Sequence, residues 1–299
     1  MDIRTDLASE VREEYMKKYA VSHKGEPDGV KFTEKRKNGV SLTEITVQNG
    51  KGVEAIGKPE GRYITVGVGK IWQADADKFK NSADMIAETI VSLSPGKAST
   101  LVVGLGNRFV TADAVGPCAA SHVIATRHIK EKEKTVYDSA GFGDVAVITP
   151  GVLAQTGYEA AEQIRAAVDV LHPERIIVID ALAARKLSTL ETTVQLSDAG
   201  ICPGSGVGND RGELSERVLG VPVVSIGVPT IVDAATLILD MFGESRDDGM
   251  LQPALEKAAG CYVCPKDTDK AVEELSRLIG YAINKACHRM MTYEEMAFF

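Results

Sequence analysis

The sequence lacks any long apolar run. Its longest uninterrupted stretches are short, such as Ile176–Ile179, and none approaches the roughly 18 residues that a membrane-spanning helix needs. The N-terminal residues Met-Asp-Ile-Arg-Thr-Asp-Leu contain no apolar core of a secretory signal peptide. Cysteine is also scarce, with five in 299 residues, so we expect reduced thiols in a cytosol-like compartment. We expect no association with a membrane.

Positive charge is in deficit, because 34 Lys and Arg residues face 42 Asp and Glu residues and leave a net charge of −8. An acidic chain lacks the basic surface by which proteins hold nucleic acid, so we expect no direct binding to DNA or RNA. Hydrophobic residues make up 44% of the chain and charged residues 25%, which is typical of globular proteins. This composition supplies a full core and excludes disorder as the dominant state.

Several familiar motifs are missing. No Gly-Lys-Ser/Thr occurs, and the Gly-x-Gly at 104–106 has Phe109 where a dinucleotide fingerprint needs its third glycine. The five histidines form no pair at helical ligand spacing, and no serine lies in a Gly-x-Ser-x-Gly elbow. Cys261-x-x-Cys264 has only Cys287-His288 as a second ligand pair, so we expect buried, inert thiols there. Serine-type and zinc-type hydrolysis therefore lack support.

Apolar strands alternate with amphipathic helices along most of the chain, which predicts a parallel sheet covered on both faces. We expect an α/β fold with three α/β/α layers, a mainly parallel sheet, and one domain over 1–299 in which residues 1–70 form an N-terminal extension with an edge hairpin. The expected strands are 40–47, 62–68, 99–107, 144–151, 175–181, 221–229 and 261–265; the expected helices are 9–20, 80–93, 113–130, 156–171, 231–242 and 267–290, with a loop over 21–38.

Two aspartates stand out against this pattern. Asp180 directly follows four apolar residues of a buried strand, and Asp113 lies just past the glycine turn that ends another. Ligands of open α/β sheets bind outside the carboxyl ends of the strands, so neighbouring strands would bring both carboxylates to one crevice. Such a pair binds a metal or shares a proton for acid–base chemistry, although each residue alone is also a common helix cap. The glycine-rich segment 198–215 fits a substrate-cradling loop and a flexible crossover equally well.

Longer blocks of the sequence resemble the spore germination proteases of Bacillus and Clostridium relatives. The resemblance runs through nearly the whole chain in the same order and rests on IRTDLASE (3–10), VVGLGNRFVTADAVGP (102–117), TPGVLAQTGYE (149–159), VIDALAARKLSTLETTVQLSDAGICPGSGVGN (178–209) and LGVPVVSIGVPTIVDAATL (219–237). The family's two essential aspartates fall in the TADA and VIDALA motifs, which are Asp113 and Asp180 here. The resemblance thus names the same pair as the pattern.

The resemblance implies an endopeptidase that degrades small acid-soluble spore proteins when a spore germinates. It also implies a homotetramer made during sporulation in the cytoplasm of the spore core, as a zymogen that processes itself, and a fold similar to that of hydrogenase maturation endopeptidases. Those enzymes use a metal-binding Glu, Asp and His, whereas no metal or other cofactor is expected here. Family precursors carry a longer pro-segment; only three residues precede Arg4, and we expect the Asp2–Ile3 bond to mimic a family cleavage site, which falls after an acidic residue.

We expect the aspartate pair to activate a water molecule, with one carboxylate as base and the other, protonated, as acid. Arg108 and Arg185 each lie five residues from one aspartate, and either could receive an acidic substrate side chain or polarise the scissile carbonyl. Two alternatives remain open at this point. One is a metal-dependent endopeptidase of the hydrogenase-maturation type, and the other is a non-enzymatic protein that binds acid-soluble spore proteins without cutting them.

Overall fold

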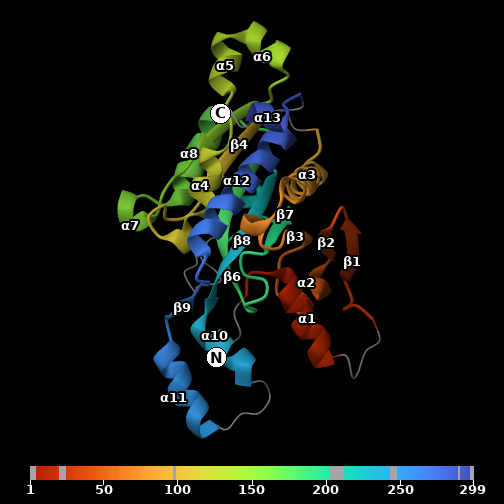
Figure 1. The fold of residues 1–299 in the computed structure, drawn as a ribbon, viewed down its shortest axis with the longest axis vertical. Coiled ribbons are helices and arrows are strands. Elements are labelled where there is room, and N and C mark those ends of the chain that lie inside the picture. Colours follow the sequence, from red (N-terminus) through yellow and green to blue (C-terminus); the bar gives the residue numbers. More distant parts are fainter. Residues whose placement is uncertain are drawn as a thin grey trace.

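The computed structural model describes residues 5–19, 25–96, 99–202, 212–242, 248–288 and 290–296. The nine strands that these residues form belong to one mixed sheet (Figure 1). The strands are β1 (Val30–Lys37), β2 (Val40–Val47), β3 (Gly61–Gly67), β4 (Ser99–Gly104), β5 (Asp144–Ile148), β6 (Arg175–Ala184), β7 (Thr193–Ser197), β8 (Val223–Asp233) and β9 (Tyr262–Val263). Their order is β1-β2-β3-β7-β8-β6-β4-β5, with β9 beside β8. The four strands β8, β6, β4 and β5 run parallel, and the others join antiparallel.

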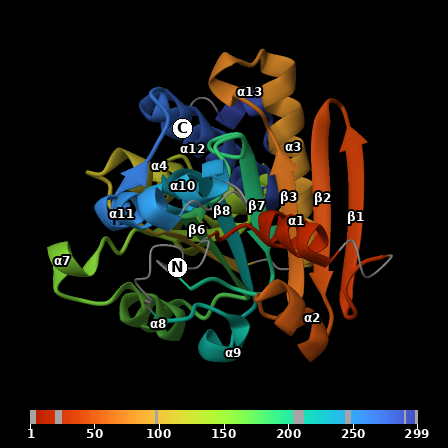
Figure 2. The ribbon, with the colours of Figure 1, turned by 90° about the horizontal axis from the view of Figure 1, so that it is seen from below.

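Helices cover both faces of the parallel strands. The helices are α1 (Ala8–Tyr19), α2 (Gly50–Ile56), α3 (Ala76–Leu93), α4 (Val115–Ser121), α5 (Arg127–Lys132), α6 (Lys134–Ala140), α7 (Leu153–Thr156), α8 (Ala160–Leu171), α9 (Glu216–Leu219), α10 (Ala234–Phe242), α11 (Asp248–Ala258), α12 (Thr268–Cys287) and α13 (Tyr293–Met296), with short 3-10 turns η1 (Ile71–Gln73) and η2 (Thr111–Asp113). Figure 2 shows α4 and α12 on one side of the sheet and α8 on the other. The predicted α/β class and its three layers are confirmed.

Each parallel strand is apolar on both faces, as a doubly covered sheet requires. On β6, Ile177 and Ile179 pack into the core beneath α3, α4 and α12, whereas Ile176 and Val178 pack beneath α8. Each fully buried aliphatic side chain contributes about 1.5–3 kcal/mol relative to an exposed one. The two cores therefore fix the position of β6, and with it that of Asp180.

The N-terminal extension is larger than the sequence predicts. The expected antiparallel pair is present as β2 and β3, but residues 30–37 form strand β1 where a loop was predicted. The Asn38-Gly39 turn, with both φ angles positive, closes the β1–β2 hairpin. Strand β1 escapes prediction because charged side chains on an edge strand leave no apolar alternation. Strand β3 then pairs with β7, so the extension continues the sheet and makes it mixed rather than mainly parallel.

Other expected boundaries also change. The single helix predicted over 113–130 is wrong, because η2, α4 and α5 divide that segment into separate short turns. Helix α10 begins three residues later than predicted, since β8 continues to Asp233, whose carboxylate accepts a hydrogen bond from the backbone N–H of Thr236 at 2.8 Å. Helices α2 and α11 and strand β7 are absent from the prediction. Within the described residues, no helix combines the length and apolarity needed to cross a membrane.

Glu191 is a fully buried carboxylic acid in the loop between β6 and β7. Burial raises the pKa of this carboxyl group, the neighbouring Asp267 and Asp269 raise it further, and the Thr268 hydroxyl opposes them. A carboxyl group whose pKa is raised in the folded state favours folding at pH values below its unfolded-state pKa. This contribution to stability is lost as the pH rises through its folded-state pKa.

We expect Glu191→Gln to be about 1 kcal/mol more stable than wild type at pH 7 and to lose this advantage near pH 4. Urea unfolding followed by the fluorescence of Trp72, the single tryptophan of the sequence, measures the difference. The exposed Glu60→Gln is the control. Equal stability of Glu191→Gln and wild type at pH 7 would contradict the prediction.

Candidate active site

A cavity of about 890 Å³ lies beside the C-terminal half of β6 and the loop after β4. Both Asp113 and Asp180 line it. Its walls come from the N-terminal extension, from β6 and β8, and from the segments around residues 199–202 and 212–214. The sequence predicts that the two aspartates share one crevice at the sheet edge. Both line this cavity, but Asp180, Gln195 and Gly227 line it from within β6, β7 and β8 rather than from the ends of the strands. Their role as a catalytic pair stays a prediction at this point.

Asp180 lies inside β6 rather than at a helix start. It pairs with Gly227 of β8 in a parallel register, and β6 continues for four more residues to Ala184. Its side chain is 6% exposed, and its Oδ1 accepts a hydrogen bond from the backbone N–H of Ala181 at 2.9 Å. The alternative role as a helix cap is therefore wrong for Asp180.

Asp113 is placed by a loop that is tied to two strands. The backbone N–H of Leu105 donates to the carbonyl of Ile179 at 2.8 Å, one residue before Asp180. The Thr230 hydroxyl of β8 donates to the carbonyl of Ala112 at 2.6 Å, one residue before Asp113. The loop is thus held at both ends, and its geometry fixes Asp113 relative to Asp180.

Within this loop the backbone N–H of Asn107 donates to Asp113 Oδ2 at 2.7 Å. The loop also depends on a glycine. Gly106 has φ +113°, and a Cβ atom there would lie 2.1 Å from the backbone oxygen of Asp113. A side chain at this position would force Asp113 to move.

We expect Gly106→Ala to lower the activity that depends on Asp113 more than tenfold and to cost about 2–3 kcal/mol of stability, because the substitution combines an unfavourable φ with a backbone clash. Gly25→Ala is a matched control, since Gly25 has φ +129° with nothing within 4 Å of the added atom. Activity assays and urea unfolding of both variants separate the effect of the backbone clash, which occurs only at position 106, from the effect of the positive φ, which both positions share. Equal activities of the two variants would show that the clash does not reach Asp113.

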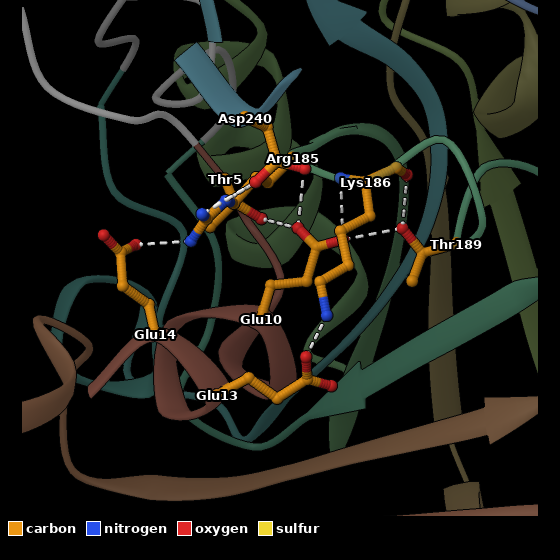
Figure 3. A network of polar contacts seen from close by, with 8 residues as sticks. All are labelled: Thr5, Glu10, Glu13, Glu14, Arg185, Lys186, Thr189 and Asp240. Atoms are coloured by element: carbon orange, nitrogen blue, oxygen red, sulfur yellow. Dashed lines mark hydrogen bonds and ion pairs between the residues drawn. The ribbon is translucent and has the colours of Figure 1, made fainter. Parts of the chain in front are cut away.

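The two predicted arginines lie outside the described lining of this cavity. Arg108 is exposed and lines a smaller neighbouring hollow of about 310 Å³ that shares Gly106 and Gly151 with the main one. The side chain of Arg185 is 11% exposed, and its guanidinium binds Glu14 at 2.9 Å and Asp240 at 2.7 Å (Figure 3). A substrate role for either arginine stays a prediction, and Arg185 would have to leave two carboxylates to take it.

The N-terminal extension contributes charged residues that sequence analysis missed. Asp6 and Lys58 line the cavity, as do Glu159 and Glu213. The backbone of Asp6 donates to the carbonyl of Ala183 at 2.9 Å, and its Oδ2 accepts the N–H of the same residue at 2.9 Å. No local pattern identifies Asp6 or Lys58, because both lie in turns whose position depends on long-range pairing. The IRTDLASE block, which contains Asp6, is the available signal.

The glycine-rich segment 198–215 is described only at its two ends, and residues 203–211, including Asn209, Asp210 and Arg211, lie outside the described residues. Ile201 and Leu214 bridge the ends through two backbone hydrogen bonds of 2.9 and 2.8 Å. Both ends line the cavity. The substrate-cradling role stays a prediction.

The prediction of buried thiols at Cys261 and Cys264 is wrong, since both are exposed at the ends of β9. Extended backbone separates residues three apart by about 10 Å, which is too far for a disulfide between them. No group of three His, Cys, Asp or Glu side chains among the described residues is arranged to hold a metal ion. The cavity lining, as far as it is described, contains no histidine. These residues therefore do not match the Glu, Asp and His set of a metal-dependent maturation enzyme.

Comparison with known proteins shows which proteins this chain is similar to. A family model for germination proteases matches residues 7–243. A germination protease of Clostridium perfringens is 36% identical over 99% of this chain and 98% of its own, and one of Priestia megaterium is 42% identical over 80% of this chain and 65% of its own. Among solved structures, the NiFe-hydrogenase maturation protease HycI of Thermococcus kodakarensis gives a TM-score of 0.36 at 18% identity and covers 65% of this chain and 98% of its own.

Proposed function

Because this chain belongs to the germination protease family, we propose that it is an endopeptidase that begins the breakdown of small acid-soluble spore proteins during germination and cuts after acidic residues. The observation that carries the proposal is the presence of Asp113 and Asp180 in the lining of one large cavity. A cavity of this size accommodates several residues of an extended peptide. The chemistry then depends on what two carboxylates can do to a peptide bond.

In the proposed mechanism, one carboxylate accepts a proton from a water molecule as the water oxygen attacks the scissile carbonyl carbon. The other carboxyl group, protonated, donates a hydrogen bond to the carbonyl oxygen and stabilises the charge that develops there. The proton taken from water then passes to the departing amide nitrogen as the C–N bond breaks. Each aspartate accepts a backbone N–H bond, so the assignment of base and acid stays open between Asp113 and Asp180.

Incubation with a purified small acid-soluble spore protein, followed by mass analysis of the fragments, tests the proposal. We expect internal cuts on the carboxyl side of glutamate or aspartate. An intact substrate that remains bound would instead support the non-enzymatic alternative. A chelator arm addresses the other alternative: loss of cleavage with a chelator and its return with added metal would support a metal-dependent endopeptidase.

We also propose that the protein acts as a homotetramer in the cytoplasm of the spore core and is made as a zymogen. Light scattering of the purified protein tests the tetramer by its mass. N-terminal sequencing before and after incubation tests self-processing, and a new N-terminus at Ile3 would identify the Asp2–Ile3 bond, which lies outside the described residues. Arg108, beside the rim of the cavity, is a proposed contact for substrate that extends beyond it.

A further inference from the structure

Lys58 is the basic residue of the active-site cavity. Among the described residues that line this cavity it is the only cation, whereas five carboxylates line it. It lies in the turn between α2 and β3, so the N-terminal extension brings it to a cavity whose candidate catalytic aspartates, Asp113 and Asp180, lie in η2 and β6. The five acidic residues are Asp6, Asp113, Glu159, Asp180 and Glu213.

The Lys58 ammonium group has few protein partners for its position. It is half-buried and donates one long hydrogen bond, of 3.5 Å, to the carbonyl of Thr5. None of the ion pairs between described residues includes Lys58. Burial lowers the pKa of this ammonium group, and Asp6 partly offsets the effect. An ammonium group has three donors, so the bond to Thr5 leaves donors available to a ligand in the cavity that Lys58 lines.

The turn that carries Lys58 is fixed in place. Gly57, with φ +64°, ends α2 in a left-handed cap whose N–H donates to Val53 at 2.7 Å. The Tyr63 hydroxyl of β3 donates to the carbonyl of Pro59 at 2.8 Å. Residues on both sides of Lys58 are therefore anchored, so no backbone entropy of this turn has to be lost when Lys58 binds a partner.

We propose that Lys58 is a specificity-determining residue, whose ammonium group binds the carboxylate side chain of the substrate residue at the scissile bond. This inference rests on the proposed endopeptidase function. A partly desolvated cation that forms no ion pair with a described residue is best matched by a carboxylate, which forms a charge-assisted hydrogen bond with it. Elsewhere in the cavity a substrate carboxylate would meet the like charges of the lining aspartates and glutamates. The arrangement therefore fixes where the acidic side chain is held.

Two peptides that differ only by Glu or Gln before the scissile bond test the proposal, with wild type, Lys58→Met and Lys58→Arg. We expect wild type to favour the Glu peptide and Lys58→Met to lose about 10²-fold in kcat/KM for that peptide while changing little for the Gln peptide. Lys58→Arg keeps the charge and should retain most of the preference. Lys70→Met, which removes an exposed lysine of the same extension, is the matched control and should behave as wild type.

The outcomes separate this inference from the proposed function. Equal losses on both peptides would overturn the specificity role and assign Lys58 to the fold or the chemistry. A wild type that cuts both peptides equally well would overturn it while leaving the endopeptidase intact. Failure of wild type to cut either peptide or a spore protein would remove the proposed function, and the inference with it. Binding of Glu- and Gln-ending product peptides, measured by calorimetry, gives a second readout: Lys58→Met should weaken only the former.

Discussion

Asp180→Asn and Asp113→Asn are each expected to lower kcat/KM for a spore-protein substrate by about 10³-fold or more. Asparagine keeps the size and the acceptor oxygen of aspartate but cannot take a proton from water or give one to the departing nitrogen. The hydrogen bonds from Ala181 and Asn107 can both be kept, so the fold should survive each substitution. Fragment analysis over a time course and an unfolding midpoint measure the two properties separately.

Asp233→Asn is a matched control for this experiment. Asp233 is also a buried aspartate, 4% exposed, but it ends β8, caps α10 and lies outside the described lining of the cavity. We expect nearly full activity from this variant. In the proposed mechanism the two cavity aspartates act on the same step, so the double variant should be little worse than either single one. Additive losses, or one aspartate variant with full activity, would contradict a shared mechanism.

The sequence predicts part of this site well. Asp180 is visible because four apolar residues lead directly to it, which is a local pattern. Its convergence with Asp113 depends on β6 lying beside both β4 and β8, and the alternation of strands and helices suggests neighbouring strands without giving their order. The motif resemblance supplies the pairing that the pattern alone leaves open.

The cavity residues that the sequence did not predict were missed for one physical reason. Asp6 and Lys58 reach the cavity through pairings between segments far apart in the chain, such as Asp6 with Ala183 and β3 with β7. A charged residue in a turn has the same local signature whether it faces solvent or a cavity. The same limit hides β1, whose edge position explains its polar sequence. The extension was predicted as an edge addition, and the structure makes it one wall of the site.

The other large effect is expected from Glu10 of α1, which is 1% exposed and locks the extension to the loop after β6 (Figure 3). Its Oε2 accepts the N–H of Arg185 at 2.7 Å and the Thr5 hydroxyl at 2.5 Å. Its Oε1 accepts the N–H of Lys186 at 3.1 Å and the Thr189 hydroxyl at 2.6 Å. One buried carboxylate thus satisfies four donors.

We expect Glu10→Ala to cost about 3–5 kcal/mol, because it leaves these donors buried without an acceptor. Glu10→Gln should also destabilise, since each carboxylate oxygen accepts a backbone N–H and an amide nitrogen cannot accept at either place. Glu13→Ala, which breaks only the partly exposed ion pair with Lys186, should stay within about 1 kcal/mol of wild type.

Urea unfolding followed by Trp72 fluorescence ranks the Glu10 and Glu13 variants, and a cleavage assay at a temperature where each remains folded tests the link to function. Asp6 binds Ala183, three residues after Asp180, and Glu10 holds the helix that starts two residues after Asp6. Loosening this helix should therefore lower activity as well as stability. A Glu10→Ala variant as stable as Glu13→Ala would mean that the extension is held by its apolar contacts alone, chiefly those of the fully buried Leu7 with Leu182 and Val232.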